Sequence, residues 1–237
     1  MRSSNPKIAE SRNSNRILVI MAKAPRAGGV KTRLAQNLPP SSVVDFYRCL
    51  LDDTMALAKS LDGVEAAIMC PAGDVDDLAL VAGEAARVVA QTGEGLAAGL
   101  RSVFAQYATP GRRRVIAFNS DSPHLPRTVL ESAFDALDSC DLIVGPTYDG
   151  GYYLVGATAS YPELFDSSGM GTANALEALL SRARALRLSV GFTDTFYDID
   201  VPADLNRLAA ELEAAADRAP RTAAWLKQWR LARGAAI

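Results

Sequence analysis

The sequence predicts a single three-layer α/β/α domain with a mostly parallel, mixed central sheet. From Ile17 onward, short apolar runs alternate with longer segments of helical periodicity. That order is typical of parallel strands joined by right-handed crossovers. The early runs are almost continuously apolar, as expected for strands that are covered on both faces. The length of 237 residues, with 49% hydrophobic and 22% charged residues, suits one large α/β domain.

The apolar and helical patterns divide the chain into elements. The expected strands cover residues 17–22, 66–70, 87–90, 115–119, 142–145, 152–155 and 188–192. The expected helices cover residues 41–60, 74–82, 95–107, 127–138 and 172–185, and the tail from Pro202 predicts two more, separated near 219–220. Trp225 and Trp229 lie four residues apart on one face of the last helix, which we expect them to dock onto the body.

Composition and charge exclude several classes of protein. The net charge of −2 gives no electrostatic footprint for nucleic acid or an anionic membrane, and no apolar run approaches the ~20 residues of a membrane span. The three cysteines are widely separated, which predicts reduced thiols in the cytoplasm. Because His124 is the single histidine, a histidine-rich zinc site is excluded, and we assign His124 no functional role. Residues 1–16 are polar and predict a disordered leader before the domain at 17–237.

A basic, glycine-bearing loop follows the first expected strand directly. Its charged and flexible residues are Lys23, Arg26, Gly28, Gly29, Lys31 and Arg33. Glycines let backbone N–H groups approach an anion, while Lys31 and Arg33 would neutralise phosphate charge. The loop has neither the frame of a Walker A motif nor that of a dinucleotide fingerprint. Its position after the first strand favours phosphate binding over a solvated basic turn.

Carboxylates end a second strand and recur late in the chain. Asp121 follows the apolar run 115–119, and Asp198 and Asp200 would point to the same side of an extended segment. Three converging carboxylates repel one another unless a cation lies between them, and oxygen ligands suit Mg²⁺ or Mn²⁺. The alternative for Asp200 is a residue that merely begins the next helix, and the local sequence favours neither. Asp204 lies near that helix start, where it would favour the helix dipole.

The segment 145–156 contains a turn between two expected strands. Asp149-Gly150-Gly151 is a strong turn signal, and Tyr152 is a good strand former. A hairpin explains the glycines. It does not explain why Thr147 and Asp149 gather where a ligand would lie, so this segment is a candidate acceptor site.

These segments together resemble the GT-A-fold superfamily of nucleotide-diphospho-sugar transferases. The matching parts are 22–34, 91–96, 120–125, 145–156 and 198–205, spread over residues 17 to about 210. The nearest likeness is a bacterial family labelled "glycosyltransferase A", sometimes linked by name to arsenosugar biosynthesis. That family also resembles guanylyltransferases acting on phospholactate or phosphoenolpyruvate. The resemblance implies a nucleotide-diphospho-sugar transferase-like fold.

The resemblance also implies a role for each group of residues. Nucleotide binding falls to Lys23, Arg26, Gly28, Gly29, Lys31, Arg33, Gln91 and Gly93. Mg²⁺ or Mn²⁺ would be held by Asp121, Asp198 and Asp200. The acceptor would be bound by Asp149, Gly150, Gly151 and Tyr152. The catalytic residues would be Asp121, Asp200 and Lys31.

Two reactions and one binding function remain open at this point. The first is glycosyl transfer from a nucleotide-diphospho-sugar to a small-molecule acceptor, which the family label favours. The second is nucleotidyl transfer from an NTP to a phosphorylated small molecule with release of pyrophosphate, which the cationic loop favours. The third is a non-catalytic nucleotide-binding protein. The three retained carboxylates argue against the third, because clustered acids without a cation cost stability.

Overall fold

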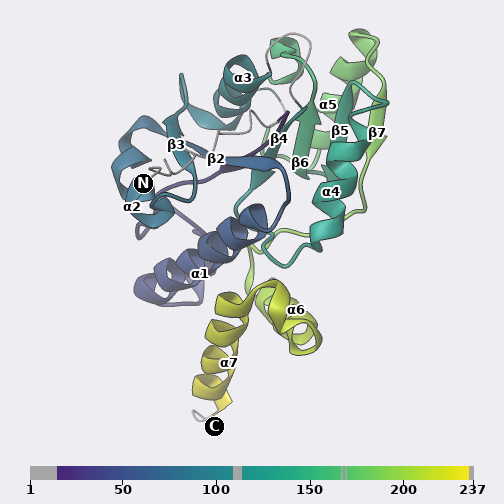
Figure 1. Cartoon of the computed structure of the whole chain (residues 1–237). Coiled ribbons are helices and arrows are strands. Elements are labelled where there is room, and N and C mark those ends of the chain that lie inside the picture. Colours follow the sequence, from purple (N-terminus) through teal and green to yellow (C-terminus); the bar gives the residue numbers. More distant parts are fainter. Residues whose placement is uncertain (1–14, 109–113, 167, 169, 235–237) are drawn as a thin grey trace, which may run out of the picture.

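The computed structural model describes residues 15–108, 114–166, 168 and 170–234. Figure 1 shows a twisted sheet flanked by helices, with a helical pair at the C-terminal end. The strands are β1 Arg16–Met21, β2 Val64–Cys70, β3 Arg87–Ala90, β4 Arg114–Asn119, β5 Leu142–Pro146, β6 Tyr152–Ala157 and β7 Val190–Phe192, in the order β3-β2-β1-β4-β6-β5-β7. Strand β6 is antiparallel to β4 and β5, and the other pairs are parallel. The predicted fold class is confirmed.

Five of the helices lie between strands in the sequence, and the last two follow β7. The helices are α1 Pro40–Lys59, α2 Val75–Ala82, α3 Gly95–Tyr107, α4 Arg127–Ala136, α5 Ala175–Ala185, α6 Pro202–Ala214 and α7 Pro220–Gly234. Short 3₁₀ helices are η1 Leu34–Gln36, η2 Ala72–Asp74, η3 Pro162–Leu164 and η4 Ala216–Arg218. Among the described helices, none is both long and apolar enough to cross a membrane.

Alternation along the strands produces two apolar cores, one on each face of the sheet. Leu18 and Ile20 of β1 pack in one cluster with residues of α1, α2 and α4. Ile17 and Val19 point to the opposite face, where they pack with residues of α3 and α5. All four side chains are fully buried, as expected for a central strand in a sheet with both faces covered.

Several boundaries differ from those expected from the sequence, and two of them bear on the leader and on the site. Strand β1 begins at Arg16, a residue that the sequence placed in the leader, and residues 1–14 lie outside the described part. Helix α5 begins at Ala175 and not at 172, because the preceding residues form a turn that closes over the hairpin between β5 and β6. In that turn the Ala175 N–H donates to Thr172 O at 3.1 Å, and the Leu176 N–H donates to Gly150 O at 3.0 Å.

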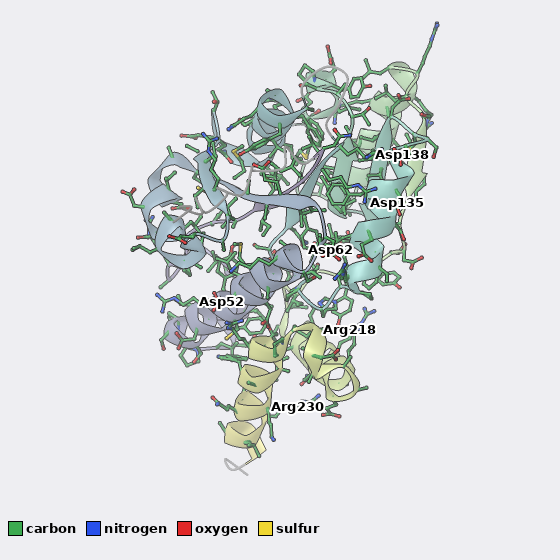
Figure 2. The ribbon with its side chains drawn as sticks, viewed as in Figure 1. Asp52, Asp62, Asp135, Asp138, Arg218 and Arg230 are labelled. Atoms are coloured by element: carbon green, nitrogen blue, oxygen red, sulfur yellow. The ribbon has the colours of Figure 1, made fainter. Side chains whose placement is uncertain are left out.

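A third apolar cluster attaches the C-terminal helices to α1. Trp225 of α7 packs on Phe46 of α1 with 4.7 Å between ring centroids, which confirms the docking predicted for the last helix. The buried Asp53 of α1 caps the start of α7, since its Oδ2 accepts from the Thr222 N–H at 2.8 Å. Farther along α7, Arg230 (labelled in Figure 2) donates to the Asn206 carbonyl oxygen of α6 at 3.1 Å.

Candidate functional site

A cavity of about 830 Å³ opens at the carboxyl edge of the parallel strands. Its walls come from the residues that follow β1, β2, β3 and β4, together with Tyr47 of α1 and Asp200. In open α/β sheets this edge is where ligands bind. The lining of this cavity includes Lys23, Gly29, Lys31, Gln91, Gly93, Asp121 and Asp200 among the residues singled out from the sequence.

Lys31 joins the two carboxylates that line the cavity. Its Nζ lies 2.9 Å from Asp121 Oδ2 and 2.9 Å from Asp200 Oδ1. The Lys31 side chain is 3% exposed, whereas those of Asp121 and Asp200 are 28% and 43% exposed. Burial alone would lower the pKa of the ammonium, but the charges of Asp121 and Asp200 outweigh it and raise the pKa above its usual value. Lys31 is therefore a permanent cation that holds two carboxylates together.

The backbone of Lys31 is unusual as well. Its φ of +46° lies in the left-handed region, which a residue with a side chain rarely adopts. Gly28, with a φ of +76°, supplies the other left-handed position of the same loop. The loop returns to regular packing at Val30 and Leu34, both buried in the cluster shared with α1 and α6. The strained residue of this loop is thus the one that contacts both carboxylates.

Asp198 and Asp200 lie on one side of an extended segment, as predicted. Tyr197 and Ile199 point the other way into the cluster beneath α6, while Asp198 accepts from Asn119 Nδ2 at 2.7 Å. Burial raises the pKa of Asp198 to about 7, and the charge of Asp121 adds to the effect. The charges of Asp200 and Asp149 raise it further, and that of Lys31 lowers it. Asp121, Asp198 and Asp200 therefore share one electrostatic environment.

Asp204, and not Asp200, caps helix α6. The Asp204 Oδ2 accepts from the N–H groups of Asp200 and Val201 at 2.9 and 2.8 Å. The side chain of Asp200 is turned to Lys31. Of the two interpretations that the sequence left open for Asp200, the geometry favours the site over the helix start.

The donor chemistry of these acids fits a hard divalent ion. Three carboxylates offer oxygen ligands only, which suit Mg²⁺ or Mn²⁺. Within the described residues, however, no three Asp, Glu, His or Cys side chains are arranged to hold a metal ion. The ammonium of Lys31 contacts oxygens of two of them instead. The three carboxylates thus have the chemistry to bind Mg²⁺ or Mn²⁺, and two of them are arranged as ion pairs with Lys31.

Tyr47 is a site residue that sequence reasoning missed. Its hydroxyl accepts from the Lys23 N–H at 3.2 Å and lies 3.0 Å from Ser120 Oγ. The Thr54 hydroxyl, about two turns farther along the same face of α1, donates to Ser120 O at 3.3 Å. Burial raises the pKa of Tyr47 to about 12, and the charge of Asp121 adds to the effect. These contacts join the ends of β1 and β4 next to Asp121. The residues that they connect are 24 to 73 positions apart in the sequence.

The remaining cations of the first loop do not line the cavity. Arg26 is tied to η2 and α2, because its guanidinium lies 2.9 Å from Asp74 Oδ1 and 2.6 Å from Asp77 Oδ2 and also donates to Gly73 O at 2.9 Å. Arg33 is exposed and makes no ion pair within the part of the chain that the structure describes. Gly28 also lies outside the cavity lining. Lys23 and Lys31 are the loop cations placed directly at the cavity.

Gln91 holds the glycine turn that forms the far wall of the cavity. Its Nε2 donates to Gly93 O at 3.0 Å and to Gly95 O at 3.2 Å. Both glycines have left-handed backbones, with φ of +82° and +78°. The amide donors of Gln91 are thus engaged within the protein, and its Oε1 lies so close to Gly99 of α3 that a Cβ on that glycine would be 2.7 Å away.

The Asp-Gly-Gly turn lies outside the cavity lining but near Asp198. Asp149 Oδ1 accepts from the Thr147 hydroxyl at 2.5 Å and from the Gly151 N–H at 3.3 Å, which orients the carboxylate. A Cβ on Gly150 would lie 1.9 Å from Ala173 O, and its φ is +87°. Tyr152 is directed elsewhere, since its hydroxyl donates to Met170 Sδ at 3.3 Å.

A comparison with protein families gives the chain its relatives. Residues 54–172 match the family described as "Uncharacterized protein conserved in bacteria (DUF2064)". The chain belongs to the DUF2064 family. The matched region runs from the middle of α1 to the turn before α5 and includes Ser120, Asp121 and the Asp149–Gly151 turn. No curated protein matches this DUF2064 chain.

Solved structures share the fold of this DUF2064 member. A provisionally assigned nucleotide-diphospho-sugar transferase from Desulfovibrio desulfuricans G20 is 27% identical with a TM-score of 0.83, covering 91% of this chain and 95% of that one. The inositol-1-phosphate CTP transferase from T. maritima is 16% identical with a TM-score of 0.57, covering 85% and 96%. The 4-diphosphocytidyl-2C-methyl-D-erythritol synthase from Anaerococcus prevotii is 11% identical with a TM-score of 0.57, covering 84% and 96%.

Proposed function

We propose that this chain is a metal-dependent transferase that uses a nucleotide-activated donor. The observation that carries the proposal is the meeting of Lys31, Asp121 and Asp200 on the wall of the 830 Å³ cavity. A cavity of that volume is within the range of small-molecule sites. It lies beyond the carboxyl ends of parallel strands, where open α/β sheets bind nucleotides.

The cavity offers separate places for the parts of a nucleotide. Lys23, Lys31 and the backbone of Gly29, which line the cavity, would bind the phosphates. Gln91 and Gly93 lie on the wall that would meet the base. Asp121, Asp198 and Asp200 would hold Mg²⁺ or Mn²⁺, which in this position would offset the charge of the departing phosphate oxygen. Arg26 acts indirectly, by tying the loop to Asp74 and Asp77.

The acceptor side of the proposal rests on Asp149. Its Oδ1 is occupied by Thr147 and Gly151, so Oδ2 is the oxygen left to accept a hydrogen bond from an acceptor hydroxyl. The side chain is exposed, and its charge reaches Asp198. Asp149 would therefore orient a small acceptor beside the carboxylates. Gly150 and Gly151 would shape the turn, and Tyr152 would support its wall from behind.

The reaction that we place first is glycosyl transfer from a nucleotide-diphospho-sugar to a small acceptor. It is supported by the 27% identity to the D. desulfuricans protein and by the resemblance to the bacterial glycosyltransferase A family. Nucleotidyl transfer is the second candidate. The observation that favours it is the presence of two lysines, Lys23 and Lys31, at one cavity, which matches the higher charge of a triphosphate.

One binding screen separates these reactions. The melting temperature would be measured with each common NTP and nucleotide-diphospho-sugar, with and without Mg²⁺ or Mn²⁺. A selective ligand at about 100 times its Kd stabilises the folded chain by about 2.7 kcal/mol. Preference for nucleotide-sugars supports glycosyl transfer, and preference for NTPs supports nucleotidyl transfer. Stabilisation without turnover of any donor and acceptor pair would indicate a binding protein, and no stabilisation would reject the proposal.

A further inference from the structure

Lys31 contacts carboxylate oxygens that a divalent ion would need. Its Nζ lies 2.9 Å from both Asp121 Oδ2 and Asp200 Oδ1, from a side chain that is only 3% exposed. From this arrangement we infer that Lys31 makes metal binding conditional on the donor. Its ammonium stays paired with Asp121 and Asp200 until the phosphates of a bound donor replace them as its partners. The inference rests on the proposed function and adds an order of events to it.

The physical basis is competition between two cations for the same oxygens. An ammonium and a divalent ion that both contact Asp121 and Asp200 would lie close enough to repel each other strongly. A metal alone must therefore displace Lys31, and the displaced ammonium would be left in a buried position without a counter-charge. Among the described residues no three acidic side chains are arranged to hold a metal, and the ammonium of Lys31 contacts two of the acids instead.

The donor removes that obstacle, because its phosphates offer Lys31 a new partner in the same cavity. Lys31, Gly29 and Lys23 all line this cavity, so phosphates bound there would lie beside the lysine side chain. Its four-carbon stem is flexible, whereas the loop on either side is fixed by the buried Val30 and Leu34. Once the ammonium contacts phosphate, Asp121 and Asp200 are free for the metal. Donor and metal then strengthen each other's binding by the same factor.

The test measures Mn²⁺ binding directly, from the loss of the electron paramagnetic resonance signal of free Mn²⁺. In the wild type without nucleotide, binding should be weak. Lys31→Met removes the competing ammonium and should bind Mn²⁺ alone about tenfold more tightly or better. Lys31→Gln serves as a second, more polar variant. The matched control is Lys59→Met, which removes an equal charge at the exposed end of α1 and should not change Mn²⁺ affinity.

A second arm adds ADP, CDP, GDP and UDP in turn, after subtraction of the Mn²⁺ that each diphosphate binds in solution. In the wild type, the preferred diphosphate should strengthen Mn²⁺ binding by about tenfold or more, and Mn²⁺ should strengthen diphosphate binding equally. The Lys31 variants should lose most of this coupling. The wild-type measurement stands even if a variant does not fold.

The outcomes separate this inference from the proposed function. Equal affinity of wild type and Lys31 variants for Mn²⁺ alone, or no mutual strengthening in the wild type, overturns the competition. If the wild type still binds Mn²⁺ together with a diphosphate, the proposed function survives that result. If no diphosphate and no Mn²⁺ bind in any combination, the proposed function itself fails.

Discussion

The side-chain amide of Asn119 donates to Asp198 Oδ1 at 2.7 Å, joining the end of β4 to the extended segment before α6. The Ser122 hydroxyl approaches the same oxygen at 3.4 Å. These donors favour the ionised carboxylate. Burial and the charge of Asp121 nevertheless raise the pKa of Asp198 to about 7. Its pKa is thus shifted from the usual acidic range toward neutral pH.

The first prediction concerns Asp198→Asn. The pKa of Asp198 is about 7 in the folded chain, above its usual value of 3.8 in the unfolded chain. The free energy of unfolding should therefore fall as pH rises from about 4 to about 7. Asparagine keeps the acceptor for Asn119 and removes the charge. Melting curves should show no difference from wild type near pH 4 and a variant more stable by on the order of 2 kcal/mol at about pH 8. A difference that does not vary with pH would contradict this assignment.

The second prediction has the opposite sign and concerns His124. The ring is fully buried against Tyr197, with 4.8 Å between centroids, and neither nitrogen has a hydrogen-bond partner among the described residues. Burial lowers the pKa of His124 to about 4 from 6.5. Its contribution to stability is therefore complete above about pH 6.5 and is lost as pH falls toward 4.

Replacement of His124 by Phe should remove that loss. Phenylalanine preserves an aromatic contact with Tyr197 and cannot be protonated. Since His124 is the only histidine of the sequence, the difference between the two stability–pH curves isolates its titration. The stability advantage of the variant over wild type should be larger at about pH 4 than above about pH 7 by on the order of 2–3 kcal/mol. Parallel curves would show that His124 does not titrate in this range.

The strand ends of the site could be predicted from the sequence, because local patterns determine where a strand stops. The apolar run before Asp121 placed that residue at the carboxyl edge, and the two-residue spacing placed Asp198 and Asp200 on one side. The residues of the first loop that reach the cavity followed from their position after β1. In each case the pattern of one short segment was enough to place the residue.

The partners across the site could not be predicted, because they depend on packing between distant segments. Lys31 meets Asp200 across 169 residues, and Arg26 meets Asp74 across 48. A lysine and an arginine in one loop carry the same sequence signal for phosphate binding. The structure leaves Lys31 at the cavity and ties Arg26 to its outer wall. Tyr47 gave no signal at all, since its spacing on α1 is that of any buried helix residue.

The third prediction concerns the turn that carries Asp149. Gly150→Ala would place a Cβ 1.9 Å from Ala173 O at a φ of +87°, so the turn and the loop before α5 cannot keep their contact. The free energy of unfolding should fall by about 3 kcal/mol. Gly171→Ala is the matched control, with a φ of +71° and no atom within 4 Å of the added Cβ, and should cost about 1 kcal/mol. Chemical denaturation measures both, and equal losses would mean that the contact with Ala173 does not matter.

The last prediction distinguishes the two interpretations of Asp200. Since Asp204 Oδ2 already accepts from the N–H groups of Asp200 and Val201, Asp200→Asn should leave the start of α6 intact. It removes one of the two carboxylates that Lys31 joins, and Mg²⁺ should then lose most of its effect on nucleotide affinity, by about tenfold or more. Asp204→Ala should do the reverse: it removes the cap and lowers stability by about 1 kcal/mol, yet keeps the Mg²⁺ effect. Nucleotide affinity, measured by calorimetry with and without Mg²⁺ in the wild type and both variants, decides between them. If Mg²⁺ strengthens binding equally in the wild type and in Asp200→Asn, Asp200 is not a metal ligand and serves only to neutralise Lys31.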